Sequence, residues 1–279
     1  MWTRGYPVRL AGRAQINVYQ DIEYRHDGAV AYILHARPNA RNAESRNLLD
    51  EMDQALSAAV ADDAVRAIVI GGQGDHFSAG HDLKEAERER QGFTVEQRWA
   101  YEEKRYFDYA LRIWDCPKPT IARVQGACIA GGFMVANMCD LIVASDDAFF
   151  ADPVGRTMSA AAVEVLIHPW VMGLRRAKEF LYTGERMSAT EAHAIGMVNR
   201  VVPRSQLDAD TQALAAKVAE APPFAMKLMK RSLNRTFDAQ GFRTALAAHF
   251  DTHQLSHMSD EFASMRAGGL SGAIGRGKA

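Results

Sequence analysis

The chain has 279 residues, of which 48% are hydrophobic and 24% are charged, and its 33 basic residues nearly balance its 34 acidic ones. This composition is typical of a globular protein and excludes a disordered or fibrous chain. The near-zero net charge gives no overall field that would attract nucleic acid or an anionic membrane, so we expect neither as a partner.

The chain has three cysteines, Cys116, Cys128 and Cys139, without Cys-x-x-Cys or Cys/His ligand spacing. An odd number in this pattern favours buried free thiols over a disulfide framework, and we expect no metal site. The first twenty residues lack the apolar run and cleavage site of a secretory signal. The most apolar stretch, residues 133–144, is too short for a bilayer and is interrupted by Asn137 and Asp140. We therefore expect a cytoplasmic protein.

The first two thirds of the chain alternate between strand and helix patterns. Short apolar runs rich in β-branched residues predict strands at 30–34, 65–70, 120–124, 141–144 and 198–202. A helical pattern at 45–60 separates the first two, and other helical patterns separate the later ones. Repeated crossovers of this kind predict an α/β fold with a mostly parallel sheet.

Strand patterns end near Pro203, and the remaining sequence predicts helices at 206–220, 223–235 and 239–255. Ser188 and Glu191 have capping-box spacing, with Gly196 as a natural helix end. The glycine-rich segment 268–279 is expected to be a loose tail. We predict an α/β core over residues 1–203 and a helical region over 204–279.

Two glycine-rich segments follow predicted strands, where open α/β sheets bind ligands. Residues 76–85 read HFSAGHDLKE, and Gly80 allows the backbone to turn neighbouring N–H groups into a cleft. Residues 124–132 read VQGACIAGG and lead into an apolar helix that begins near Phe133. The N-terminus of a helix offers unpaired N–H groups and favours an anion or a developing oxyanion. Each loop alone is equally compatible with tight packing.

Taken together, the two loops resemble a known family. Residues 77–85 are similar to the FxAGxDLKE segment of the crotonase (enoyl-CoA hydratase/isomerase) superfamily, and residues 124–140 to its VxGxxxGGGxxLxxxCD segment. The resemblance extends from about Val30 through Arg235. It implies a spiral of ββα units, a C-terminal helical trimerisation region and an acyl-CoA substrate, with coenzyme A belonging to the substrate and no separate cofactor.

The resemblance also implies roles for particular residues. The backbone N–H groups of His81 and Gly131 would hold the thioester oxygen of an enolate-like transition state. The backbone carbonyl of Ala79 would meet the CoA adenine, and Arg37 and Arg41 lie in a segment that commonly touches the CoA phosphates.

The sequence departs from the hydratase pattern at the two usual catalytic glutamates. Those positions hold Met134 and Val154, so no obvious carboxylate pair exists to activate water and supply a proton. Ordinary hydration is therefore doubtful. Isomerisation, which one base can support, or a specialised hydration or cleavage is expected instead.

Three other groups are candidate acids or bases. Asp152 is the first choice, although a turn or helix cap is an alternative role. Glu164 lies near a position used by isomerase-type relatives, but could equally form a surface or intersubunit ion pair. His168 is a proton shuttle or a packing histidine, and a side-chain role for His81 is left open.

Two classes of function follow from these observations. The first is an enzyme that stabilises a CoA-thioester enolate, and the second is a noncatalytic acyl-CoA-binding protein or partner subunit. We expect a homotrimer or a dimer of trimers, because the C-terminal helices need a surface for their apolar positions. The candidates for that packing are Phe224, Leu228, Leu233, Phe237, Phe242, Leu246 and Phe250.

Overall fold

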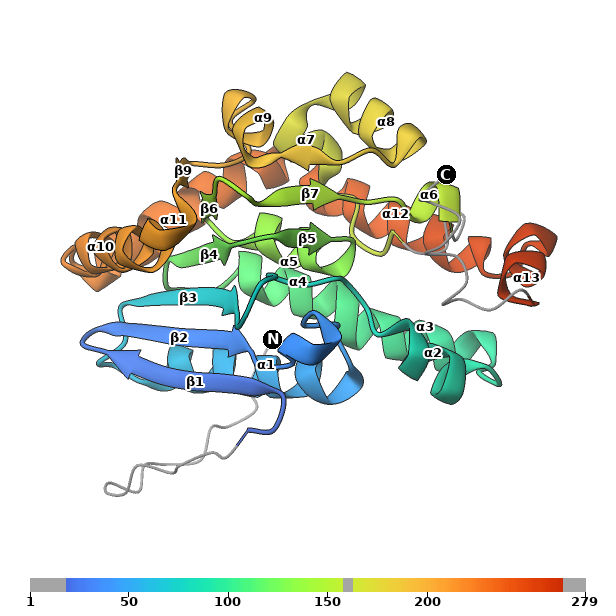
Figure 1. The fold of residues 1–279 in the computed structure, drawn as a ribbon, viewed down its shortest axis with the longest axis horizontal. Coiled ribbons are helices and arrows are strands. Elements are labelled where there is room, and N and C mark those ends of the chain that lie inside the picture. The colour runs from blue at the N-terminus through green and yellow to red at the C-terminus, as the bar shows by residue number, and fades with distance from the viewer. Residues whose placement is uncertain (1–18, 158–162, 268–279) are drawn as a thin grey trace.

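The computed structural model describes residues 19–157 and 163–267, and Figure 1 shows their arrangement. Its main sheet has six strands in the order β1-β2-β3-β4-β6-β9. Only the β1/β2 pair is antiparallel in this sheet, whereas the other neighbouring strands run parallel. The strands are β1 (Ile22–Asp27), β2 (Val30–His35), β3 (Ala67–Gly72), β4 (Thr120–Val124), β6 (Leu141–Ser145) and β9 (Arg200–Val202). The predicted α/β class is therefore confirmed.

Helices cover both faces of this sheet, as the alternation along β2 shows. Val30, Tyr32 and Leu34 pack in one apolar cluster with Leu207 and other residues of α10 (Leu207–Ala219). Ile33 points to the opposite face and joins the main core with residues of α1 (Arg46–Ala61). Successive side chains of a strand point to opposite faces, so β2 is buried on both sides.

A second sheet of three short strands carries one of the glycine-rich loops. Its order is β5 (Ala127–Ile129), β7 (Phe149–Ala151) and β8 (Met187–Ser188). The sequence analysis missed this sheet, because strands of two or three residues are too short for a recognisable alternation. It also missed β1, whose six residues, IEYRHD, are mostly polar. The helix after β5 is α5 (Gly131–Met138), which begins two residues before the predicted start at Phe133.

The remaining helices surround these sheets. They are α2 (Leu83–Arg90), α3 (Val95–Glu102), α4 (Asp108–Trp114), α6 (Val154–Thr157), α7 (His168–Met172), α8 (Leu174–Thr183), α9 (Ala189–Ala194), α11 (Pro223–Ala239), α12 (Phe242–Ser256) and α13 (Asp260–Ala267), with the 3₁₀ turns η1 (Pro38–Ala40) and η4 (Arg204–Gln206) and the π-helix η2 (Glu103–Phe107). The capping box predicted for α9 is present. In Figure 1 the C-terminal helices run across the molecule, from α10 at one end to α13 at the other.

The C-terminal helices bury part of their apolar surface within the chain itself. Of the residues suggested for oligomer packing, Phe242, Leu246 and Phe250 lie in its interior. Phe224, Leu228 and Leu233 on α11 are exposed, and Phe237 is partly buried against the core. The predicted trimer and the division at residue 204 remain predictions. The predicted tail at 268–279 lies outside the described residues.

Candidate active site

The two glycine-rich loops lie against each other. Ser78 N–H donates to the carbonyl of Ala127 at 3.1 Å, and Ile129 N–H donates back to the carbonyl of Ser78 at 3.0 Å. Gly80 has φ +83°, a conformation that L side chains rarely adopt, and an added Cβ there would lie 2.9 Å from the carbonyl oxygen of Ile129. Only glycine fits this crossing without a shift of the backbone.

The contact between the loops brings His81 beside Gly131. A Cβ added to Gly131 would lie 2.6 Å from Cε1 of His81 and would overlap Oε2 of Glu44. Among the described residues, the backbone N–H groups of His81 and Gly131 donate no hydrogen bond. Gly131 is also the first residue of α5, where the helix dipole adds positive potential. The two N–H groups are thus free to bind an oxygen of a ligand.

The imidazole of His81 lies between two buried carboxylates. Its Nδ1 is 3.1 Å from Oε2 of Glu44, and its Nε2 is 3.4 Å from Oε1 of Glu164. The two glutamates are 2% and 3% exposed, and neither ion-pair contact has the alignment of a hydrogen bond. Buried charges require opposite charges nearby, and here one imidazole faces two carboxyl groups.

This arrangement changes the titration of both partners. Burial alone would lower the pKa of His81, but Glu164 and Glu44 outweigh it and raise that pKa to about 10. Burial favours the neutral form of Glu164, yet the neighbouring His81 holds the pKa of that carboxyl below its ordinary value. At neutral pH the site therefore contains an imidazolium and an ionised Glu164.

Tyr106 fixes the plane of the His81 ring. The two rings stack with centroids 3.7 Å apart and an interplanar angle of 16°. Tyr106 belongs to the π-helix η2, a type of distortion that is frequent at functional sites. Nη1 of Arg90 donates to the Tyr106 hydroxyl at 2.6 Å, so the tyrosine is itself held in place.

A small cavity of about 10 Å³ adjoins this group. Glu44, His81, Tyr106, Gly131 and Met134 contribute to its wall. The other wall residues are mainly apolar or aromatic, and they are Leu49, Arg105, Tyr109, Ala110, Val135 and Val165. Its size suits about one water molecule. The candidate oxyanion donors and the imidazolium thus meet at a small, largely apolar space.

Asp152 and His168 pair with each other at a different place. Nε2 of His168 lies 3.0 Å from Oδ2 of Asp152, and both side chains are fully buried. The His168 ring stacks on Phe133 with centroids 4.7 Å apart. Like Glu164, neither residue contributes to the cavity wall. Of the three acid–base candidates, the structure brings only Glu164 to His81.

The predicted CoA contacts lie on the segment before α1. Nη2 of Arg37 donates to Oδ2 of Asp82 at 3.0 Å, so this guanidinium also supports the loop that carries His81. Arg41 is exposed, and its carbonyl accepts the N–H of Ala79 at 3.0 Å. Within residues 19–157 and 163–267, the carbonyl of Ala79 accepts no hydrogen bond. These positions are compatible with the implied contacts, which remain predictions.

Glu44 is the site residue that sequence reasoning missed. It lies three residues beyond Arg41, and the sequence did not indicate it as a partner of the loops. Its Oε1 accepts from Oγ of Ser78 at 3.2 Å, and its backbone pairs with His81 in an isolated bridge. The sequence does place an acidic residue directly before Ser45, the N-cap of α1. Acidic residues are common at the starts of exposed helices, so this position alone does not indicate a functional role.

Comparisons with known proteins agree with this fold and site. The model of the family described as Enoyl-CoA hydratase/isomerase matches residues 25–268. The chain is 43% identical to a Mycobacterium tuberculosis protein provisionally named enoyl-CoA hydratase EchA13, over 83% of this chain and 78% of that protein. The protein therefore belongs to the enoyl-CoA hydratase/isomerase family and has the crotonase fold.

Other relatives show how the scaffold is used. A solved enoyl-CoA hydratase/isomerase from Xanthobacter autotrophicus Py2 superposes with a TM-score of 0.87 at 36% identity, covering 93% of this chain and 98% of that one. A 4-chlorobenzoyl coenzyme A dehalogenase from Arthrobacter is 34% identical over 76% of this chain and 77% of its own length. Two proteins that are named for different reactions thus have similar sequence identities to this chain. Within the described residues, no helix is long and apolar enough to cross a membrane.

Proposed function

We propose that the protein is an acyl-CoA isomerase that moves a proton within a thioester through an enolate, with Glu164 as the base. The observation that carries this proposal is the contact of Glu164 with His81, the residue whose backbone N–H is the candidate oxyanion donor. Oε2 of Glu164 is buried and makes no hydrogen bond among the described residues. It is therefore available to accept a proton.

In the proposed reaction, the ionised carboxylate of Glu164 takes a proton from a carbon next to the thioester or conjugated with it. The electron pair of the broken C–H bond moves to the thioester oxygen, where the N–H groups of His81 and Gly131 donate hydrogen bonds. The protonated Glu164 then returns the proton to another carbon, and the double bond has moved. No water is consumed, so a second carboxylate is not required.

The charge on His81 compensates for the low basicity of Glu164. A carboxylate with a lowered pKa is a weak base, and it works only where the product enolate is stabilised. The imidazolium lies at the donor that would receive the negative charge, in surroundings of low polarity where such an interaction is strong. Glu44 is fixed by Ser78 and by its own backbone, so we assign it the orientation of the imidazole.

The apolar residues at the two usual glutamate positions support isomerisation over hydration. Met134 is part of the cavity wall and is 3% exposed, whereas Val154 is 1% exposed and begins α6. Neither can activate water. Coenzyme A would enter with the substrate, and the reaction needs no further cofactor.

Proton exchange in deuterated water tests this function. Purified protein is incubated with a panel of saturated and unsaturated acyl-CoA thioesters, and deuterium uptake and double-bond position are followed by mass spectrometry and NMR. We expect exchange and migration for at least one thioester, both lost in Glu164→Gln. Binding of acyl-CoA without exchange anywhere in the panel would instead establish a noncatalytic binder, and rapid formation of a hydroxyacyl-CoA would establish a hydratase.

A further inference from the structure

A second buried group of ionisable side chains lies outside the candidate active site. Glu102 ends α3, whereas His253 and His257 come from the end of α12, more than 150 residues later in the chain. The exposed fractions of these side chains are 3% for Glu102, 0% for His253 and 8% for His257. The proposed reaction uses none of them.

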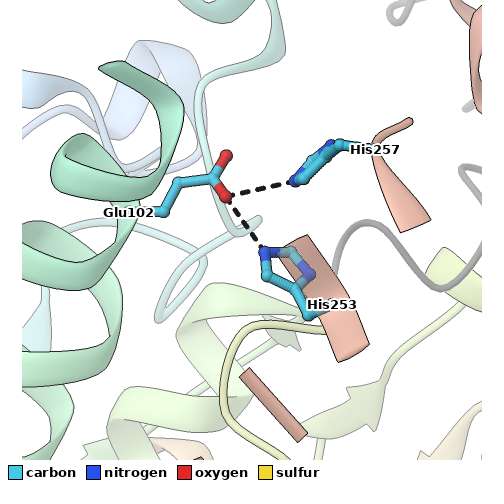
Figure 2. A group of neighbouring side chains, drawn as sticks. All are labelled: Glu102, His253 and His257. Carbon is cyan, nitrogen blue, oxygen red and sulfur yellow. Dashed lines mark hydrogen bonds and ion pairs between the residues drawn. The ribbon is translucent and has the colours of Figure 1, made fainter. Parts of the chain in front are cut away.

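The three side chains converge on one point. Nε2 of His253 and Nε2 of His257 lie 3.0 Å and 3.1 Å from the same oxygen, Oε2 of Glu102. Figure 2 shows both rings directing a nitrogen at this oxygen from one side. The planes of the two rings stand at 76° to each other. All three potential ligand atoms lie within 4.8 Å of one another.

We propose that Glu102, His253 and His257 form a binding site for a divalent transition metal of the zinc class. Two imidazole nitrogens and one carboxylate oxygen are a common ligand set for Zn²⁺, with a fourth position left for water or another ligand. Ligand atoms around a tetrahedral zinc lie about 3.3 Å apart, given bond lengths of about 2.0 Å. The two separations from the carboxylate oxygen, 3.0 and 3.1 Å, need to widen by a few tenths of an ångström. The two histidine nitrogens lie within 4.8 Å of each other, and they have to settle at the same spacing of about 3.3 Å.

Local sequence explains why the histidines meet. Residues four apart on a helix lie on the same face, one turn above the other. His253 lies in the last turn of α12, and His257 is the residue that follows the helix. The expectation of no metal site was based on the spacing around the cysteines, and it did not take this histidine pair into account.

Metal binding would change the protonation of this group. An imidazole nitrogen ligates a metal only without its proton, so the metal would replace the protons that the two Nε2 atoms direct at Glu102. Metal uptake is therefore accompanied by proton release.

Outer contacts hold the carboxylate in place. Nη1 of Arg98 lies 3.4 Å from Oε1 of Glu102, and Nε2 of Gln254 donates to Oε2 at 2.8 Å. Ligating carboxylates are commonly hydrogen-bonded in this way. The same contacts also satisfy Glu102 when no metal is bound. The experiment must therefore distinguish a metal site from a cluster that is only hydrogen-bonded.

Zinc content and cobalt spectra of untagged protein test the site. The protein is stripped with a chelator, dialysed, and titrated with Zn²⁺ or Co²⁺ alone. We expect about one tightly bound zinc per chain, a visible d–d band with Co²⁺, and a melting temperature raised by about 5 °C when Zn²⁺ exceeds its Kd one-hundredfold. Glu102→Gln and His257→Gln should each lose the band and the thermal shift.

His249→Gln is the matched control. This histidine lies one turn before His253 on the same helix, and its Nε2 contacts the carbonyl of Val163 at 2.8 Å instead of Glu102. The control should bind zinc like the wild type, even if the change in α12 alters its stability. Absence of bound zinc and of a thermal shift in the wild type would overturn the proposal. Equal zinc uptake by wild type, Glu102→Gln and His257→Gln would overturn it as well, since it would place the metal elsewhere.

Discussion

Two of the buried carboxylate–histidine groups that the structure describes lie in different surroundings, which give them different capacities. Asp152 and His168 form a pair that is fully enclosed by the core, where His168 stacks on Phe133. His81 instead lines a cavity beside Gly131, and it is shared by Glu44 and Glu164. The same side-chain chemistry thus stabilises structure in one place and can meet a ligand in the other.

The largest expected effect separates the two carboxylates in catalysis. Glu164→Gln should lower kcat for proton exchange by about 10² to 10⁴, the usual contribution of a general base, with a much smaller change in acyl-CoA affinity. Asp152→Asn should retain most of the turnover of correctly folded protein, because Asp152 faces His168, whereas Glu164 faces His81. Steady-state kinetics and calorimetry on both variants give the comparison.

The opposite outcome would reverse the assignment. If Asp152→Asn loses turnover by two orders of magnitude while Glu164→Gln keeps it, Asp152 is the base, as its place in the sequence first suggested. Met134→Ala serves as a control for changes at the cavity wall, since a thioether cannot transfer a proton and its loss should leave proton exchange in place.

The second effect is on folding stability, where replacing Asp152 should have a larger effect than replacing Glu164. Asp152→Asn leaves His168 beside a neutral amide in a fully buried position, and we expect a loss of about 2 kcal/mol in the free energy of unfolding. Glu164→Gln should cost less, because His81 keeps Glu44 as a partner. Urea denaturation at pH 7 measures both. A more stable Asp152→Asn variant would contradict the structural role given to this pair.

The sequence indicated the two loops of the candidate site more directly than its acid–base group, and both assignments remain predictions. Gly80 and Gly131 mark the loops because their backbone geometry and close contacts exclude other residues, and this requirement is local. The choice between Asp152 and Glu164 depends on which side chain faces His81, and residues distant in sequence decide it. Asp152 precedes Glu164 by only twelve positions, yet its side chain turns to His168.

The helices and parallel strands were predictable for a similar reason. Helix α1 has its N-cap at Ser45 and buries Leu48, Met52, Leu56 and Ala59 at helical spacing. In contrast, Glu44 gains its role only when the first loop pairs with the segment before α1, and no local pattern indicates that contact. The π-helix that supplies Tyr106 was equally invisible in the sequence.

The third expected effect is a pH dependence that only the shared histidine should show. His81 has a folded-state pKa raised from 6.5 to about 10, so its contribution to stability is fully present below pH about 6.5 and is lost as the pH rises toward 10. The free energy of unfolding should therefore fall over this window by more in the wild type than in His81→Gln. Urea denaturation at several pH values measures the difference between the two curves.

A control at the surface separates this effect from general alkaline loss of stability. His26→Gln removes an exposed histidine and should follow the wild-type curve. Parallel curves for the wild type and His81→Gln between pH 6.5 and 10 would mean that His81 is not held as an imidazolium. The proposal that the charge of His81 stabilises an enolate would then be wrong, whereas the proposed role of the two backbone donors would be unaffected.

The smallest expected effect concerns Ala130, which connects the two regions. Its N–H donates to the carbonyl of Ala151 at 3.0 Å, next to Asp152, and the following residue is Gly131. Ala130 has φ +48° and ψ −113°, a conformation that favours glycine, and the resemblance to the family suggests glycine at this position. Strain of this kind costs about 1–3 kcal/mol, while glycine costs up to about 1 kcal/mol in chain entropy. Ala130→Gly should therefore raise the free energy of unfolding by about 1 kcal/mol, measured by urea denaturation. The Gly131 N–H keeps its place at the start of α5, so turnover should change less than twofold. A large change in turnover would instead show that the methyl group of Ala130 helps to position the oxyanion donors.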